Sequence, residues 1–238
     1  VLKERGYVIK ATRPVVWCPK CKSPTGDHDR LEGEGVNPEE YVLIKFKGED
    51  GVYLVAATFR PETLFGATNI WVNPEGGYVE AEVDGERWIV SEEAAFKLSE
   101  QLRRVRVLRK LKGREVVGKT FENPINKAKL VVLPARFVDT SLATGVVYSV
   151  PAHAPYDYAA LMDLKENPEE LRGYGLDPSI LGSLNPVSII RTKGFGELPA
   201  EEVIRKMGIT SQEDPKLEEA TKLIYKREYH LGYMRENC

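Results

Sequence analysis

The sequence predicts an α+β fold, a strand-rich core closing as a distorted β-barrel with peripheral helices. Short apolar runs of strand length follow one another between residues 41 and 150, separated by turn-forming segments. Amphipathic helical patterns appear mainly after residue 155. So many short strands leave edges that must be paired or covered, and closure into a barrel satisfies them.

The composition is that of an ordinary globular protein. Of 238 residues, 42% are hydrophobic and 29% are charged, and the formal net charge is −2. No basic field covers the whole molecule, so any nucleic-acid contact has to be local. Three cysteines cannot form a disulfide framework, and there is no signal-peptide pattern or apolar run of membrane-spanning length. We therefore expect a cytoplasmic protein without a membrane partner.

Residues 1–40 are predicted to be a linker and cysteine knuckle that lead into the core. Residues 1–6 have the pattern of a last helical turn ending at glycine. The stretch CPKCKSPTGDHD at 18–29 is dense in turn-forming residues. The terminal residues carry no feature of a natural terminus, so we expect a piece of a longer protein.

A candidate metal site lies in this knuckle. Cys18 and Cys21 have the two-residue spacing that lets both thiolates bind one zinc ion. Two thiolates make half a site, and His28, Asp29 or Cys238 could complete it. Spacing does not select among these three residues.

Residues 41–162 are predicted to form the core. Its strand runs are rich in Val, Ile, Tyr and Trp. The runs are 41–47, 52–58, 68–72, 86–90, 104–108, 129–133 and 145–150. The intervening GEDG, NPEGG and VDGE supply the Gly, Asn and Asp that tight turns require. They predict successive strands joined by turns.

Two helices are predicted within this core. Ser91 can cap a helix with an apolar stripe from Ala95 to Leu102. Pro155 is suited to the first position of a second helix that runs to about Leu164, because the N–H group it lacks is not needed there.

Residues 163–238 are predicted to be a helical insertion and return segment of the same domain. A short helix is expected over 199–208 and a longer one over 214–232, with Asp214 as its cap and Pro215 in its first position. The inward-facing residues of the longer helix are Leu217, Ala220 and Ile224.

Polar side chains crowd together in AATFRPETLFGAT, residues 56–68. Thr58 ends an apolar strand, and Arg60, Glu62 and Thr63 surround a proline turn. Hydroxyl groups in such places can position a water molecule or meet a ligand hydroxyl. The same residues could instead cap local backbone and form a solvated ion pair. The residue types alone leave both interpretations open.

A second candidate stretch is ATGVVYSVPAHAPYDY, residues 143–158. Asp157 lies in the first turn of the predicted helix, where the helix dipole stabilises an anion suited to holding an α-ammonium group. It could also be a plain helix cap. His153 could act as a base, although a packed histidine is the commoner case. Neither a recognisable nucleophile setting nor a Gly-rich phosphate loop is present.

Together and in this order, the two stretches resemble the editing domain of the class I aminoacyl-tRNA synthetases for leucine, isoleucine and valine. ATFRPETLFGATNIWVNP is similar to the threonine-rich motif of the archaeal and eukaryotic leucine enzymes. TGVVYSVPAHAPYDY is similar to the family's second signature, and LKERGYVIKATRPVVWCPKCKSPTGDHD resembles the segment leading in from the catalytic domain. Isoleucine enzymes usually have tryptophan at the position of Glu62, and valine enzymes have a similar R-P-E-T with a different continuation, so the leucine enzymes match best.

The resemblance implies post-transfer editing, the hydrolysis of the ester that joins a noncognate amino acid to the terminal adenosine of tRNA(Leu). The parent enzyme would ligate leucine to tRNA using ATP. One methylene group is worth only about 1–3 kcal/mol in an apolar pocket, so accurate translation needs a second, hydrolytic site. The implied partners are the tRNA 3′ end and the catalytic domain of the parent synthetase, with no cofactor for editing.

The resemblance also implies roles for single residues. Asp157 matches the aspartate that anchors the substrate's α-ammonium group, and Thr63 the threonine that blocks the cognate leucine side chain. Thr58 and Arg60 match positions around the scissile ester and the terminal adenosine. Tyr148 falls on a strand position that lines the substrate pocket.

Two positions depart from other members of the family. Phe59 stands where bacterial members have a second threonine, and Ala154 where many have another aspartate. We predict that Phe59 binds the substrate. We expect no side chain to act as the nucleophile. A water molecule held by Thr58 and by the ribose hydroxyl of the tRNA would attack the ester.

The resemblance also affects the interpretation of the cysteine pair and of two alternative functions. Relatives pair such a C-x-x-C with another one downstream, here beyond Cys238, so zinc at Cys18 and Cys21 would need that partner pair. One alternative is a module that docks the tRNA end without hydrolysis, yet such a module needs no ammonium anchor at Asp157 beside a gate at Thr63. The other is a zinc-ribbon nucleic-acid binder, which the near-neutral charge disfavours.

Overall fold

The computed structural model describes residues 1–11, 15–18, 20–26, 28 and 40–236. The chain divides into two compact units, Val1–Glu40 and Tyr41–Cys238. In the first unit, strands β1 (Trp17–Cys18) and β2 (Ser23–Pro24) pair as an antiparallel hairpin. Among the described residues, no helix has the length and apolar character needed to cross a membrane.

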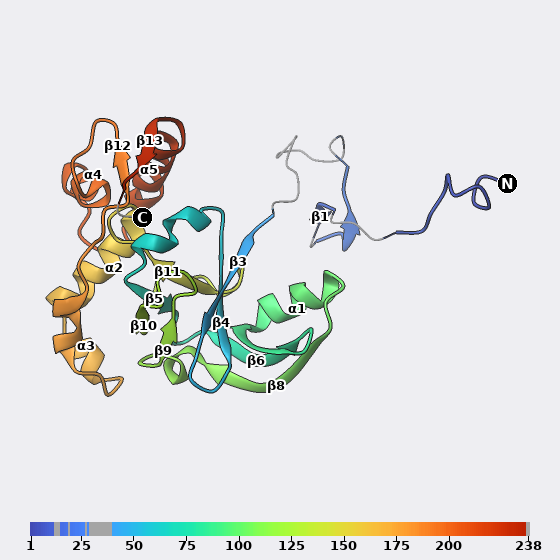
Figure 1. Cartoon of the computed structure of the whole chain (residues 1–238), viewed down its shortest axis with the longest axis horizontal. Helices are drawn as coiled ribbons and strands as arrows, with labels where there is room; N and C mark the ends of the chain where they lie inside the picture. Colours follow the sequence, from blue (N-terminus) through green and yellow to red (C-terminus); the bar gives the residue numbers. More distant parts are fainter. Residues whose placement is uncertain (12–14, 19, 27, 29–39, 237–238) are drawn as a thin grey trace. The chain divides into compact units, whose positions relative to one another are not determined.

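The second unit is built on a mixed sheet of nine strands (Figure 1). In spatial order these are β11 (Val146–Ser149), β5 (Asn69–Val72), β10 (Lys129–Pro134), β9 (Thr120–Glu122), β3 (Val42–Lys47), β4 (Tyr53–Thr58), β7 (Glu86–Ser91), β6 (Gly77–Val83) and β8 (Val105–Lys112). The β5–β10 and β4–β7 pairs are parallel, and the other pairs are antiparallel. The predicted α+β class and every predicted strand run are confirmed, whereas β6 and β9 were not predicted.

The prediction that the sheet closes as a barrel is not confirmed. Within the described residues the sheet has two edges, β8 and β11. The β8 edge carries exposed cations such as Arg106 and Lys110, which pair with Glu82 and Glu92 and discourage another strand from adding there. The sheet curls so that β11 comes beside β4, but side chains rather than a backbone ladder join them. We call this junction the β4–β11 seam.

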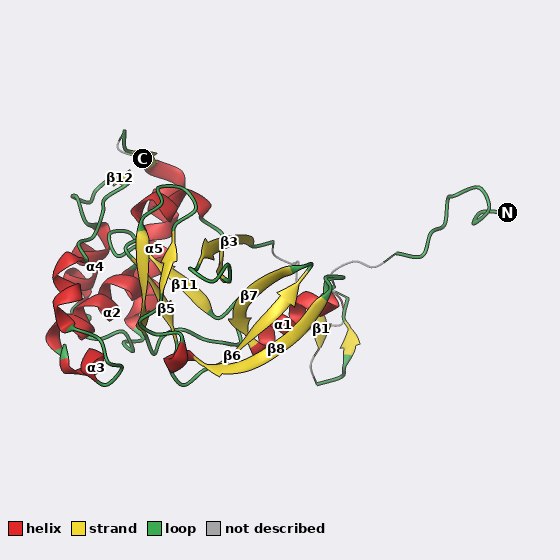
Figure 2. Ribbon diagram, turned by 60° about the horizontal axis from the view of Figure 1, so that its bottom comes forward, coloured by secondary structure: helices red, strands yellow, loops and turns green. Residues whose placement is uncertain are grey.

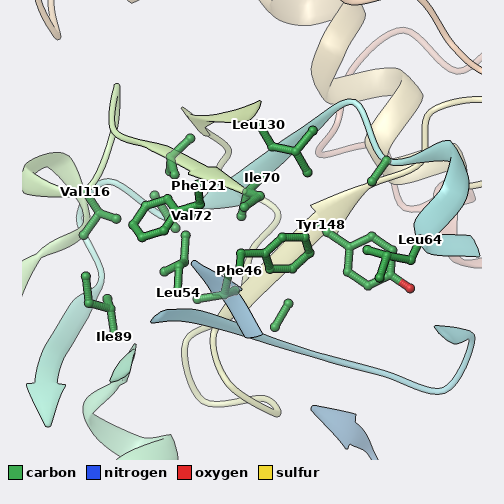
Figure 3. Close-up of a cluster of buried hydrophobic side chains, with 14 of the residues drawn as sticks. Phe46, Leu54, Leu64, Ile70, Val72, Ile89, Val116, Phe121, Leu130 and Tyr148 are labelled. Carbon is green, nitrogen blue, oxygen red and sulfur yellow. The ribbon is translucent and has the colours of Figure 1, made fainter. Parts of the chain in front are cut away.

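The inner face of the curled sheet holds the core (Figure 3). Phe46 on β3 packs beside Tyr148 on β11, with their ring centroids 5.9 Å apart. The short 3₁₀ helix η2 (Pro61–Gly66) buries Leu64 in the same core. Its position is fixed further by Asn123, whose side-chain amide donates to the Leu64 carbonyl at 3.0 Å. Core packing therefore fixes the turn that carries the polar stretch 56–68.

Helix α1 (Glu92–Glu100) packs against β6, β7 and β8. As predicted, it begins at Ser91, whose hydroxyl oxygen accepts from the Ala94 N–H at 3.1 Å. The prediction that Leu102 completes its inward stripe is wrong. Leu102 has a φ of 64° and is 76% exposed, because the chain leaves the helix there in a left-handed conformation.

The remaining helices gather at the end of the sheet away from α1 (Figure 2). They are α2 (Pro155–Glu166), α3 (Glu169–Arg172), α4 (Pro199–Met207) and α5 (Lys216–Leu231), accompanied by η4 (Pro178–Ser183) and the antiparallel pair β12 (Ile190–Thr192) and β13 (Gly232–Met234). The short helix η3 (Gly113–Glu115) directly follows β8. As predicted, Leu217, Ala220 and Ile224 of α5 are fully buried. Asp214 accepts from the Lys216 N–H at 2.9 Å, but α5 begins at Lys216, one residue later than predicted, so Pro215 rather than Asp214 is the cap residue. The buried stripe of α5 continues to Glu228, whose side chain is also buried.

Candidate active site

A cavity of about 340 Å³ lies at the β4–β11 seam. Its wall comes from β4, η2, β11, the start of α2 and one face of α5. The site residues predicted from the sequence all line it: Thr58, Phe59, Arg60, Thr63, Tyr148 and Asp157. Further lining residues were not predicted, chiefly Tyr41, Phe137, Tyr156, Thr221 and Tyr225. The fold therefore brings two distant stretches of sequence into one cavity.

The hydroxyl group of Tyr148 holds the seam together. Its oxygen lies 3.2 Å from Thr58 Oγ1, 2.9 Å from Thr63 Oγ1 and 2.9 Å from the Arg60 carbonyl oxygen. Burial raises the pKa of Tyr148, against the hydrogen bonds with Thr58 and Thr63 that lower it. The phenol therefore keeps its proton at neutral pH and is not a base.

The hydrogen bonds of this cluster leave one donor unused. Thr58 Oγ1 accepts both from the Arg60 N–H at 2.9 Å and from the Tyr148 hydroxyl. Among the described residues, the hydroxyl proton of Thr58 itself is donated to no acceptor. Since a hydroxyl group can donate one hydrogen bond while accepting others, Thr58 is available to donate to a molecule in the cavity.

Thr63 is fixed more tightly than Thr58. It is only 6% exposed, and its hydroxyl donates to the Arg60 carbonyl at 2.8 Å while also contacting the Tyr148 hydroxyl. Because the hydroxyl and the methyl group share Cβ, bonds that fix one also fix the other. The side chain of Thr63, which lines the cavity, therefore keeps one rotamer.

Asp157 combines a helix start with complete burial. It is the third residue of α2, 3% exposed, and its Oδ2 accepts from the Val150 N–H at 2.7 Å. Burial raises its pKa from the ordinary 3.8 to about 7, against the Val150 N–H and the nearby Trp71 indole, which lower it. The sequence predicted an anion stabilised by the helix dipole, but desolvation outweighs that effect here. A cation placed beside Asp157 would favour its ionised form.

Arg60 is held by acidic and aromatic side chains. Its Nη1 donates to Glu228 at 2.7 Å, its Nε donates to Glu62 at 3.0 Å, and its guanidinium carbon lies 4.8 Å from the ring centroid of Tyr225. Burial lowers the pKa of Arg60, but the carboxylates more than offset this and leave the pKa above its ordinary value. The simple interpretation of a solvated Arg60–Glu62 pair is therefore incomplete, because Glu228 is the buried partner.

His153 is a structural residue in this arrangement. Its Nδ1 lies 2.6 Å from Glu228, and its Nε2 accepts from the backbone N–H groups of Ile189 and Ile190 at 3.0 and 3.3 Å. With Nε2 accepting, Nδ1 carries the proton and donates it to the carboxylate. Glu228 accepts from the Thr192 hydroxyl as well, at 3.0 Å. His153 therefore has no free nitrogen with which to act as a base.

The cysteine pair fits half of a metal site. The Cys21 N–H donates to Cys18 Sγ at 3.3 Å, and this bond is the main cause of a lowered pKa of the Cys18 thiol. The described residues, which include His28, contain no group of three His, Cys, Asp or Glu that could hold a metal ion. Asp29 and Cys238 lie outside the described residues. Zinc binding with a second pair of cysteines stays a prediction.

Removing the Tyr148 hydroxyl should loosen the seam. We expect Tyr148→Phe to lower the free energy of unfolding by about 1–3 kcal/mol, because several buried polar groups lose a partner. Tyr78→Phe is the matched control: Tyr78 is also buried, its hydroxyl donates to the Gly145 carbonyl at 2.7 Å, and the residue lies outside the cavity. Urea unfolding should show a lower free energy of unfolding in both variants, whereas only Tyr148→Phe should change the activity of the cavity. Wild-type stability for Tyr148→Phe would contradict the importance of the bridge.

The chain resembles proteins of one family. A family model described as "Leucyl-tRNA synthetase, editing domain" matches residues 39–167. Leucine–tRNA ligase of Pyrococcus furiosus is 50% identical over 242 residues, which cover 98% of this chain and 25% of the ligase. The crystal structure of GlLeuRS-CP1 has a TM-score of 0.73 at 29% identity, covering 82% of this chain and 87% of that one.

A further solved structure has the same fold. The editing domain of P. falciparum cytosolic leucyl-tRNA synthetase has a TM-score of 0.72 at 25% identity, covering 77% of this chain and 69% of that one. The chain spans about a quarter of the length of the curated relatives it matches.

Proposed function

Because the chain belongs to the leucyl-tRNA synthetase editing-domain family, we propose that its cavity hydrolyses the ester joining a noncognate amino acid to the 3′ end of tRNA(Leu). The observation that carries this proposal is the meeting of Asp157, Thr63 and Thr58 in one cavity. Ligation of leucine to tRNA with ATP is assigned to the catalytic domain of the full-length protein. The scarcity of cysteine supports a reducing compartment such as the cytoplasm.

The amino group of the substrate is assigned to Asp157. An α-ammonium group beside the carboxylate replaces the proton that burial otherwise favours, so binding is coupled to ionisation of Asp157. The resulting ion pair is shielded from water and therefore strong. Its position in turn sets the position of the ester carbonyl, which is attached to the same α-carbon as the ammonium group.

Water is the nucleophile in this scheme. Its oxygen attacks the ester carbonyl carbon, the bond from that carbon to the ribose oxygen breaks, and a proton from the water ends on that ribose oxygen. The Thr58 hydroxyl donates to the water or to the carbonyl oxygen, because its oxygen already accepts from Arg60 and Tyr148. Since no strong base contributes, orientation supplies most of the acceleration.

Thr63 is assigned to discrimination against leucine through its fixed methyl group. Thr63→Ser keeps the hydroxyl and removes the methyl, whereas Thr63→Val keeps the shape and removes the hydroxyl. We expect Thr63→Ser to accelerate hydrolysis of leucyl-tRNA about 10- to 200-fold, since one methyl group is worth that much in an apolar pocket. Thr63→Val should continue to spare leucyl-tRNA.

The test measures hydrolysis of leucyl-tRNA and isoleucyl-tRNA by the full-length protein carrying this chain. Wild type should hydrolyse isoleucyl-tRNA and spare leucyl-tRNA. If both Thr63 variants also spare leucyl-tRNA, the methyl group is not the gate. If wild type binds tRNA but hydrolyses neither ester, the cavity is a docking module for the acceptor end.

A further inference from the structure

An aromatic pair stands at the cavity beside Thr58. Tyr41 and Phe59 stack with ring centroids 4.0 Å apart and an interplanar angle of 27°. Both residues line the cavity, yet Tyr41 is 39% exposed and Phe59 is 54% exposed. The pair is therefore part of the cavity wall and also reaches solvent.

The backbone explains why the two rings meet. Strands β3 and β4 are antiparallel, with Val42 opposite Thr58. One residue beyond this pair, Tyr41 precedes β3 and Phe59 follows β4, so the two residues lie opposite each other and their side chains are in contact. Two fixed strand ends thus hold the rings, so a ligand that stacks on them does not have to order them first.

The surroundings point to a flat, uncharged ligand. A stacked pair uses one face of each ring and leaves ring area exposed, which favours another apolar surface. The neighbouring cation, Arg60, is already bound by Glu62 and Glu228, so it adds little free positive charge. Aromatic platforms of this kind bind nucleobases by stacking, with little regard to base identity.

We infer that the Tyr41–Phe59 pair is a stacking platform for the terminal nucleobase of the RNA substrate, with Phe59 as its more exposed ring. The inference rests on the proposed function, because it takes the ribose ester to lie at Thr58, the residue next to Phe59. It assigns the base to the platform and the amino group to Asp157, at separate parts of one cavity wall.

The platform is tested first by binding. The probe is an acceptor-stem RNA with a free 3′ hydroxyl, made with a terminal adenine, a terminal guanine or an abasic ribose. The proteins are wild type, Phe59→Ala and Phe59→Tyr. Phe96→Ala is the matched control, because Phe96 is 62% exposed on α1 and lies outside the cavity.

Phe59→Ala should weaken binding of the adenine-ended RNA about 5- to 140-fold, the range expected for loss of one stacked base. It should have little effect on the abasic RNA, so the loss depends on the base. Guanine should bind nearly as well as adenine, and Phe59→Tyr and Phe96→Ala should match wild type. Equal effects of Phe59→Ala on adenine-ended and abasic RNA, or no effect on either, would overturn the platform.

Hydrolysis of isoleucyl-tRNA by the same proteins separates this inference from the proposed function. Phe59→Ala should raise KM about as much as it weakens binding and leave kcat nearly unchanged, because the ring does not touch the ester. Wild type that binds the base through Phe59 but hydrolyses no ester would sustain the platform and refute the hydrolase. If wild type hydrolyses isoleucyl-tRNA and Phe59→Ala leaves KM unchanged, the hydrolase is sustained and the platform is refuted.

Discussion

Replacing Glu228 by alanine should lower the free energy of unfolding by about 3–5 kcal/mol, because it breaks a buried charge network by removing its shared acceptor. The side chain of Glu228 is fully buried and receives hydrogen bonds from Arg60, His153 and Thr192. All three donors would lose this partner, and the guanidinium charge would lose its buried counter-ion. Urea unfolding followed by circular dichroism measures the loss.

Two variants make the Glu228 experiment specific. Glu218→Ala removes another carboxylate of α5, which pairs with Lys222 at 2.6 Å on the surface, and should change stability by less than about 1 kcal/mol. Glu228→Gln should give an intermediate loss, because its amide NH₂ group must face one of the donors. A loss below about 1 kcal/mol for Glu228→Ala would mean that the network does not hold α5 to the cavity.

Asp157→Asn should stabilise the protein and inactivate it at the same pH. The folded-state pKa of about 7 lies above the ordinary 3.8, so the folded protein binds the proton more tightly than the unfolded chain does. The contribution of Asp157 to the free energy of unfolding is therefore greatest below about pH 4 and is lost as the pH rises through 7. Asparagine has no charge to bury, so the variant should gain on wild type by as much as about 4 kcal/mol near pH 8.

The same substitution removes the carboxylate proposed to bind the substrate's ammonium group. Leaving a buried charge without its partner costs about 2–5 kcal/mol, so kcat/KM for isoleucyl-tRNA should fall at least about 30-fold. In wild type, hydrolysis should rise with pH through about 7 as Asp157 ionises. A purely structural Asp157 would instead give an active variant.

Asp163→Asn serves as the control for this experiment. Asp163 is also on α2, but it accepts from the backbone and side chain of Gln212 at 3.0 Å and lies outside the cavity. Its substitution should leave hydrolysis unchanged. If Asp157→Asn and Asp163→Asn had the same pH profile of hydrolysis, the role assigned to Asp157 would be contradicted.

Local features of the sequence were sufficient to predict most elements. Ser91 caps α1 and Pro155 opens α2 because capping depends on a few neighbouring residues. The strand runs were recognisable from β-branched and aromatic residues. Strand β6, GYVEAEV, was missed because Glu80 and Glu82 alternate with apolar residues and leave no continuous apolar run. The structure buries that carboxylate against Arg87 and Arg109.

The network around Glu228 shows what sequence patterns cannot supply. Glu228 lies four residues after Ile224 on the buried stripe of α5, and a carboxylate there is a signal that a buried partner exists. Its partners Arg60 and His153 are 168 and 75 residues away in sequence. Which cation meets a buried acid is decided by the packing of α5 against the sheet, so no local pattern identifies it.

The β4–β11 seam bears on how the cavity can change during evolution. A backbone ladder sets neighbouring strands about 4.8 Å apart whatever their side chains are. Where Tyr148 bridges Thr58 and Thr63, the spacing depends instead on the length of one side chain. A single substitution there can alter the width of the cavity without breaking a ladder. The seam therefore allows the size of the ligand that the cavity accepts to change while the surrounding fold stays the same.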